Sequence, residues 1–474
     1  MYRSRLFTVG TFAGVLAFGA AAVTQCGPGG SVSLPPSTTT TTTTVPPMFC
    51  GPGDPVGTVE PVSVKGLNAC AAESQGVPHG SNGAVSADGR FVAFVSTSSA
   101  LVTGDTNRED DVFVRDRLTG AVERVNVTSS GAQAPPPANN NTSDVFAVAI
   151  SADGRYVAFS SNHALAPGAV ELQWTEYLHD RQTGSTEVVS IAPDGSIIPS
   201  VFSVPASISD DGRYVAFESG QDVYVRDRVA GTTAMIATDQ FTGGSWPQLS
   251  GNGRYVAFIS ASPNLVPGDT NDDTDVFVYD LVAHTIERVS VTMNGAEAES
   301  LGVDNWSLPP SISDDGRYVA FTSEAWNLYG LTSPPAPMTG IPGFHVYVRD
   351  RVANTTTRVD TLPTQSPQPS AQEQSISDDG RYVAYMCTIC GDNNPDDEVL
   401  LTDMTTGQTR RVGTTPEGVV SNGADRTTSV KNMSSDGHWL LFSSTATNLG
   451  TLEPNVPSND PSGTNEDLFL QHIN

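Results

Sequence analysis

Acidic and amide side chains alternate in three segments of the chain, in a pattern suited to holding a cation. The segments are Asp105-x-Asn107-x-Glu109-x-Asp111, Asp269-x-Asn271-x-Asp273-x-Asp275 and Asp392-x-Asn394-x-Asp396-x-Glu398. Oxygen donors at alternate positions can converge on one hard cation if the loop curls, and Ca²⁺ accepts about six to eight oxygens in irregular geometry. We therefore predict these residues as metal ligands, with Ca²⁺ as the candidate cofactor.

A purely structural interpretation of the same segments stays open. Asp and Asn also begin turns by bonding their own backbone, and the glycine of a helix-type calcium loop is missing. The corresponding loop at residues 169–175 lacks the pattern, with Ala169, Glu171 and Thr175 at the first, second and fourth ligand positions. Since the repeat survives this loss, an ion there would reinforce the fold locally and carry no chemistry.

The five cysteines suggest disulfides and an anchor. Cys387-Thr-Ile-Cys390 can be a redox pair, half of a zinc site or a local disulfide, and a disulfide between Cys50 and Cys70 can fasten the N-terminal segment. We interpret these four cysteines as structural. Cys26 is the candidate for lipid attachment.

No catalytic constellation is apparent. The seven histidines occupy different positions of the repeat described below, and neither a Gly-x-Ser-x-Gly elbow nor a His-Glu-x-x-His motif occurs. We expect no catalytic residues and predict that the protein is not an enzyme.

A short phrase recurs seven times and predicts the elements that carry these residues. The first copy is Ser86-Ala-Asp-Gly-Arg-Phe-Val-Ala-Phe94, and further copies start at 151, 209, 250, 313, 377 and 434. The Asp-Gly turn followed by β-branched and aromatic residues indicates a hairpin. In the unit from Ser250 to Val291, residues 275–280 and 285–291 add two more strands. Four short antiparallel strands make one propeller blade, so the fold class is all-β, a seven-bladed propeller.

The N-terminal strand is expected to complete the last blade. The seventh unit lacks a fourth strand, while residues 58–64 match the fourth strand at 285–291 at five of seven positions. This closure pairs edges that would otherwise be exposed at the seam.

The repeat resembles that of TolB-type, WD-repeat-like propellers, whose signature is Ser-x-Asp-Gly followed by an apolar strand ending in Ala-Phe. Ser209-Asp-Asp-Gly-Arg-Tyr-Val-Ala-Phe217 carries it here. The resemblance covers residues 56–474 and implies the fold. It does not extend to the α/β domain that precedes the propeller in TolB, so the partners of TolB are not implied.

Arginines flank a recurring aspartate where the third strand of a unit turns into the fourth. Arg115-Asp116-Arg117 is one copy, and the aspartate recurs as Asp180, Asp227, Asp280, Asp350 and Asp403. We predict that it caps the turn. The alternative is a ring of surface arginines that binds acidic glycans.

The N-terminus has the composition of an export signal and a tether. Residues 1–25 combine Arg3 and Arg5 with an apolar stretch and are interpreted as a signal peptide, of lipoprotein type if cleavage precedes Cys26. Cleavage after Ala22 is the alternative. Residues 26–55, rich in Thr, Pro and Gly, are expected to form a disordered tether, and residues 56–474 the propeller.

The charge balance restricts the partners. With 24 basic and 52 acidic residues, the net charge of −28 opposes binding of nucleic acid and of anionic lipid surfaces, so a membrane is reached only through a lipid anchor. We predict a monomeric, exported scaffold at the cell envelope or outside the cell, with a protein or glycan partner on one propeller face. Trp326 and Tyr329 are expected to be exposed there. The alternatives are a polysaccharide lyase or hydrolase-like propeller enzyme and a calcium-stiffened adhesion module.

Overall fold

The computed structural model describes residues 58–62, 83–134, 145–200, 206–237, 244–299, 309–329, 344–360, 370–388, 397–427, 432–449 and 467–473, apart from the single residues 97, 108, 272, 416 and 447. The chain divides into residues 1–46 and 47–474, and all described residues belong to the second unit. The predicted signal peptide and tether, residues 1–55, therefore lie outside them. No helix among the described residues has the length and apolarity needed to cross a bilayer.

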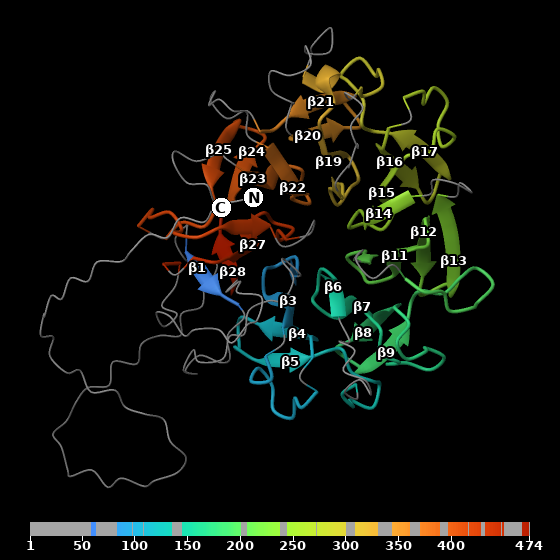
Figure 1. Cartoon of the computed structure of the whole chain (residues 1–474), viewed down its shortest axis with the longest axis vertical. Helices are drawn as coiled ribbons and strands as arrows, with labels where there is room; N and C mark the ends of the chain where they lie inside the picture. The colour runs from blue at the N-terminus through green and yellow to red at the C-terminus, as the bar shows by residue number, and fades with distance from the viewer. Residues whose placement is uncertain are drawn as a thin grey trace, which may run out of the picture. The chain divides into compact units, whose positions relative to one another are not determined.

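Seven four-stranded antiparallel sheets form the propeller, as predicted (Figure 1). Blades one to three are β2 (Gly83–Val85), β3 (Phe91–Ser96), β4 (Asp111–Asp116) and β5 (Val122–Arg124); β6 (Val145–Ile150), β7 (Tyr156–Ser161), β8 (Thr175–Asp180) and β9 (Ser185–Val188); and β10 (Ser207–Ile208), β11 (Tyr214–Ser219), β12 (Asp222–Asp227) and β13 (Thr232–Ala237). Blades four to six are β14 (Gly244–Leu249), β15 (Tyr255–Ser260), β16 (Asp275–Asp280) and β17 (Thr285–Arg288); β18 (Ser311–Ile312), β19 (Tyr318–Ser323), β20 (His345–Asp350) and β21 (Thr355–Arg358); and β22 (Ser370–Ile376), β23 (Tyr382–Thr388), β24 (Glu398–Asp403) and β25 (Gln408–Arg411).

The seventh blade combines both ends of the described chain. It contains β26 (Asp425–Thr427), β27 (Trp439–Ser444), β28 (Asp467–His472) and, outermost, the N-terminal strand β1 (Val59–Pro61). Glu60 pairs with Leu470 in an antiparallel register, and Figure 1 shows β1 beside β28. The predicted closure of the ring by the N-terminal strand is confirmed.

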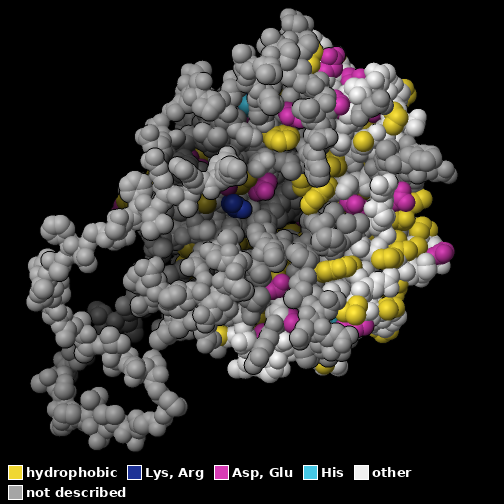
Figure 2. All heavy atoms as spheres, in the orientation of Figure 1, with side chains coloured by type: hydrophobic (Ala, Val, Ile, Leu, Met, Phe, Trp, Pro, Cys, Tyr) yellow, Lys and Arg dark blue, Asp and Glu magenta, His cyan; other side chains and the backbone are white. Residues whose placement is uncertain are grey.

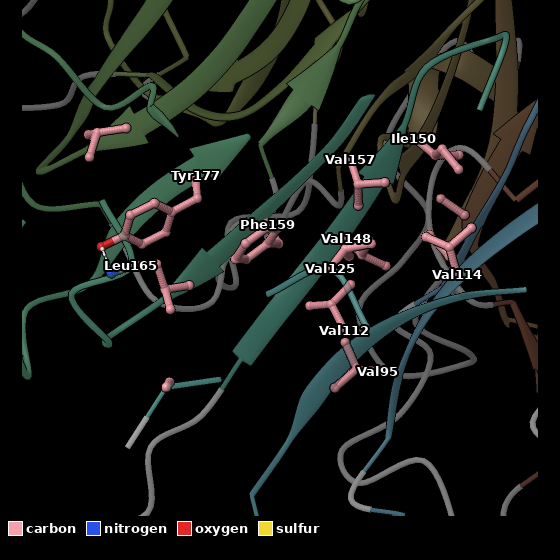
Figure 3. Close-up of a cluster of buried hydrophobic side chains, with 14 residues drawn as sticks. Val95, Val112, Val114, Val125, Val148, Ile150, Val157, Phe159, Leu165 and Tyr177 are labelled. Atoms are coloured by element: carbon pink, nitrogen blue, oxygen red, sulfur yellow. Dashed lines mark hydrogen bonds between the residues drawn. The ribbon is translucent and has the colours of Figure 1, made fainter. Parts of the chain in front are cut away.

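Aliphatic and aromatic side chains of neighbouring blades form the core. Figure 3 shows one such cluster, in which Val95 and Val112 of blade one lie near Val148, Val157 and Phe159 of blade two. All five are nearly or fully buried. Because each blade presents one sheet face to its neighbour, the apolar area is buried between blades, and no blade buries it alone.

Each turn glycine packs against an aromatic ring of the preceding blade. A Cβ atom on Gly154 would lie 2.2 Å from the Phe91 ring, and the same contact recurs at each of the seven turns. The pairs, preceding blade first, are Trp439–Gly89, Phe91–Gly154, Tyr156–Gly212, Tyr214–Gly253, Tyr255–Gly316, Tyr318–Gly380 and Tyr382–Gly437. These glycines also have φ values of +66° to +73°, so glycine is required twice over, by backbone conformation and by space.

The recurring Arg-Asp-Arg motif holds both the turn and the blade interface. Asp116 accepts the backbone N–H of Leu118 and a bidentate pair of hydrogen bonds from Arg90, which follows the first turn of the same blade. The predicted capping role is confirmed. Arg117 donates to the carbonyl of Gly89, pairs with Glu60 of blade seven and lies 4.0 Å from the Trp439 ring centroid. Equivalent arginines join blades one and two, two and three, and four and five; they are Arg181, Arg228 and Arg351.

We expect Gly154→Ala to lower the free energy of unfolding more than Gly184→Ala. Both glycines have a left-handed φ, which costs an alanine about 1–2 kcal/mol. Gly184 has no atom within 4 Å of an added Cβ, whereas Gly154 meets Phe91, and overpacking adds about 1–3 kcal/mol. Denaturant titration of the two variants measures the difference. Equal losses would show that the ring contact does not constrain the turn.

Candidate functional site

An arginine lies inside the predicted calcium loop of blade four. Asp275 begins β16, and Arg288 ends β17 beside it, so their side chains share one face of the sheet. The Arg288 Nη1 atom is 3.3 Å from Asp269 Oδ1, 2.9 Å from Asp275 Oδ2 and 2.6 Å from Glu297 Oε1. The oxygens of these three acids lie within 4.8 Å of one another, a grouping that could hold a metal ion. The guanidinium already supplies a positive charge at its centre.

The environment of this cluster is largely shielded from water. Only 2% of the Asp269 and Asp275 side chains and 9% of the Arg288 side chain are exposed. Burial raises the pKa of Asp275 to about 6, although Ser290 and Arg288 favour its charged form. A metal cation bound among these carboxylates would have to displace the guanidinium, because two cations at one buried site repel each other strongly.

The other two predicted ligands of blade four are Asn271 and Asp273. Asn271 donates from Nδ2 to the carbonyl of Ala298 over 2.7 Å and accepts the backbone N–H of Asp273. Asp273 is not among the three acids of the carboxylate cluster. The third acid, Glu297, is missing from the sequence pattern, since it lies in a later connection and accepts the N–H of Thr270.

Blade one repeats this arrangement with fewer charges. Arg124 Nη1 lies 3.3 Å from Asp105 Oδ1 and 3.1 Å from Asp111 Oδ2, and Asn107 donates to Asp111 over 3.3 Å. Burial and the neighbouring Asp111 raise the pKa of Asp105 to about 6. Glu109 turns away and pairs with His163 of blade two at 2.8 Å. Asp105 and Asp111 thus share Arg124, and Asn107 is bonded to Asp111. Glu109 instead contacts the neighbouring blade.

Gln133 of blade one gives the signal that could have identified Glu297. It accepts the N–H of Thr106 at the same sequence offset of 27 residues by which Glu297 accepts that of Thr270. Comparing the two repeats over their full length, and not only within the acidic loops, therefore predicts a contact from the later connection.

The residues at the positions of Asp275 and Arg288 differ from blade to blade. In blade six, Glu398 pairs with Arg411 at 2.9 Å, while Asp392, Asn394 and Asp396 lie outside the described residues. Blade two has Thr175 and Val188 at the positions of Asp275 and Arg288. The two positions also change independently. Blade three keeps an acid, Asp222, with Met235 at the arginine position, whereas blade five keeps Arg358, which pairs with Asp360 at 2.9 Å, with His345 at the acid position.

Two further predictions concern cysteines and tryptophans. Cys387 is disulfide-bonded, whereas Cys26, Cys50, Cys70 and Cys390 lie outside the described residues. The expected exposure of Trp326 is wrong: it is 7% exposed. It begins the 3₁₀ helix η1 (Trp326–Tyr329), whose first N–H bonds the carbonyl of Glu299, so this turn is fixed against the connection from blade four.

The comparisons with known proteins concern the fold. No protein-family profile matches the chain, and no curated protein is similar in sequence. Similar solved structures include TolB from Acinetobacter baumannii, with 14% identity, 76% of each chain covered and a TM-score of 0.36. An oligogalacturonate lyase in complex with manganese is also similar, with 13% identity, 88% of this chain and 98% of the lyase covered, and a TM-score of 0.49. The β-propeller domain of the Trilobed protease from Pyrococcus furiosus has 11% identity, with 78% of this chain and 92% of that domain covered and a TM-score of 0.45. TolB is thus among the similar structures, as the repeat suggested.

We expect added Ca²⁺ or EDTA to leave the melting temperature of the unaltered protein unchanged, because Arg288 fills the loop. Arg288→Ala leaves three largely buried carboxylates together and should lower the free energy of unfolding by about 3–5 kcal/mol. Ca²⁺ should restore part of this loss, as thermal unfolding with and without the ion can measure.

The double variant Arg288→Ala, Glu297→Gln is the matched control, since it removes one ligand and should respond less to Ca²⁺. Stabilisation of the unaltered protein by Ca²⁺, abolished by Asp275→Asn, would instead show that the ion binds beside the arginine.

Proposed function

We propose that the protein is an exported, envelope-tethered propeller that binds a protein partner and catalyses no reaction. The connection between β7 and β8, residues 162–174, carries the proposal. It belongs to the loop face, defined here as the side with the connections between the second and third strands of each blade. The turn face, with the Ser-x-Asp-Gly turns, lies opposite because the strands are antiparallel.

This connection presents apolar side chains from a fixed backbone. Val170 and Leu172 are 58% and 53% exposed. Leu172 has a φ of +66°, which is rare for a bulky residue, and its N–H donates to the carbonyl of Asn162 over 2.7 Å. Glu171 between them pairs with His163 and accepts the N–H of Ala164. A strained backbone that holds two aliphatic side chains in water is typical of a binding site.

The chemistry of the exposed pair favours a protein over a glycan. Val170 and Leu172 offer apolar area but no polar groups to pair with sugar hydroxyls. Figure 2 shows acidic side chains scattered over the face in view among hydrophobic ones, in keeping with the net charge of −28. A partner with an apolar contact and a basic periphery fits an acidic protein that exposes Val170 and Leu172.

A photoreactive residue can test the loop face in the cells that produce the protein. Placed at the exposed position Pro167, it should crosslink one partner species, whereas at the exposed position Thr119 of the turn face it should not. The double variant Val170→Thr, Leu172→Asn should lower the yield several-fold. Asn tolerates the left-handed backbone, and Thr keeps the β-branch, so the fold is preserved.

Val282→Thr is the control, since Val282 is 69% exposed on the turn face. Equal yields from both faces, or a yield unaffected by the double variant, would contradict binding at this connection.

Export is tested by the mass of the mature N-terminus. Cleavage before Cys26 with an added diacylglycerol would show lipid anchoring, and Cys26→Ser should then release the protein from the membrane fraction. Cleavage after Ala22 would show export without an anchor. An intact N-terminus in the cytoplasmic fraction would refute the proposed export, while leaving the binding surface open to the crosslinking test.

A further inference from the structure

The seventh blade replaces a repeated ion pair by two histidines. In blades one to six, an arginine after the Ser-x-Asp-Gly turn pairs with the aspartate that ends the third strand, with N–O distances of 2.7–2.9 Å. In blade six these are Arg381 and Asp403, and Asp403 lies opposite Tyr382. In blade seven, His438 has the position of the arginine. His472, opposite Trp439, has that of the aspartate.

The two imidazoles lie close together without a hydrogen bond between them. Their ring centroids are 6.0 Å apart. A zinc ion bound by an imidazole lies roughly 3.2 Å from its centroid, because the Zn–N bond is about 2.0–2.1 Å. The separation is therefore within the span of one ion between two rings, although the ring planes need to adjust.

Asp436 orients His438 for this role. Its Oδ2 atom is 2.8 Å from His438 Nδ1, so Nδ1 is the nitrogen that donates a proton to the carboxylate. Nε2 then carries the lone pair. A carboxylate on the far nitrogen is the usual second partner of a histidine that binds metal, since it fixes the tautomer and raises the basicity of the ring.

His472 is held in place and has a buried nitrogen without a partner. It is 7% exposed, and its ring lies 4.7 Å from the Trp439 centroid. Within the described residues, His472 Nδ1 has no hydrogen-bond partner. A buried polar atom left in this way costs free energy, and the cost falls if a ligand engages the ring.

The nearby charges permit a cation. Arg117 lies over the Trp439 ring and binds the carboxylate of Glu60 at 2.9 Å. Arg115 also lies near Glu60, so these two arginines share one carboxylate, and Asp436 is the negative charge beside His438.

We propose that His438 and His472 form a binding site for a first-row transition metal ion such as Zn²⁺, with water completing the coordination. Imidazole nitrogens suit Zn²⁺, Cu²⁺ and Ni²⁺ better than they suit Ca²⁺. The ion takes over the link that the arginine–aspartate pair makes in the other blades, joining the first turn of blade seven to the end of β28. Since β28 holds the closing strand β1, the site lies at the seam of the ring.

Titration calorimetry with ZnCl₂ on the whole protein, together with thermal unfolding, tests the site. We expect a saturable site that raises the melting temperature, and its loss in His438→Ala and in His472→Ala. His284→Ala is the matched control, because His284 also contacts an aromatic ring, that of Tyr279 in an edge-on arrangement, but lies in blade four. With Cu²⁺ as the probe, the electron paramagnetic resonance spectrum should show coupling to two nitrogens.

The double variant His438→Arg, His472→Asp guards against variants that fail to fold. It restores the pair of the other six blades, so it should be folded and insensitive to Zn²⁺. If the single variants or this double variant keep the zinc response of the unaltered protein, or if the unaltered protein binds no zinc, the proposal is wrong.

Discussion

The contact between an aromatic ring and the turn glycine of the next blade is the constraint on which the propeller depends. It occurs at all seven interfaces, and the ring lies where a Cβ atom would be. The turn glycine, which has a left-handed backbone and no side chain, therefore leaves space for the ring of the neighbouring blade. Every blade provides both a ring and a turn glycine, so the contact is repeated around the propeller, and the pair Trp439 and Gly89 joins the last blade to the first.

Arginine is used as an internal cation in this acidic protein. One set of arginines joins the two turns of a blade, a second set joins neighbouring blades, and a third set lies among the carboxylates of the acidic loops. The planar guanidinium suits all three tasks, since it pairs with a carboxylate through two nitrogens and stacks on an aromatic ring. With 24 basic residues against 52 acidic ones, few arginines are left to bind polyanions.

The departures from the repeat are informative because the repeat is otherwise so regular. Blade two lacks both the acid and the arginine of the acidic loop, with Thr175 and Val188 in the places of Asp275 and Arg288, whereas blades three and five each lack only one of the two. Exchange of arginine and aspartate together for His438 and His472 in blade seven is the departure from which the metal site is proposed. The strained Leu172 in the loop of blade two is a third departure, on the face opposite the turns.

The number of blades, their four strands and the closure by residues 59–61 could be predicted from the sequence, because local turn chemistry and alternation recur in register seven times. The capping aspartates were predictable for the same local reason. The position of an arginine inside the acidic loop could not be predicted, since Arg288 and Glu297 come from later segments that only the folded sheet brings to Asp275. Likewise, His438 and His472 are 34 positions apart and meet only through the pairing of β27 with β28. The sequence by itself determined the repeated hairpins and hence the ring; the tertiary structure decided which charges meet, because side chains from distant strands become neighbours only when the sheets form.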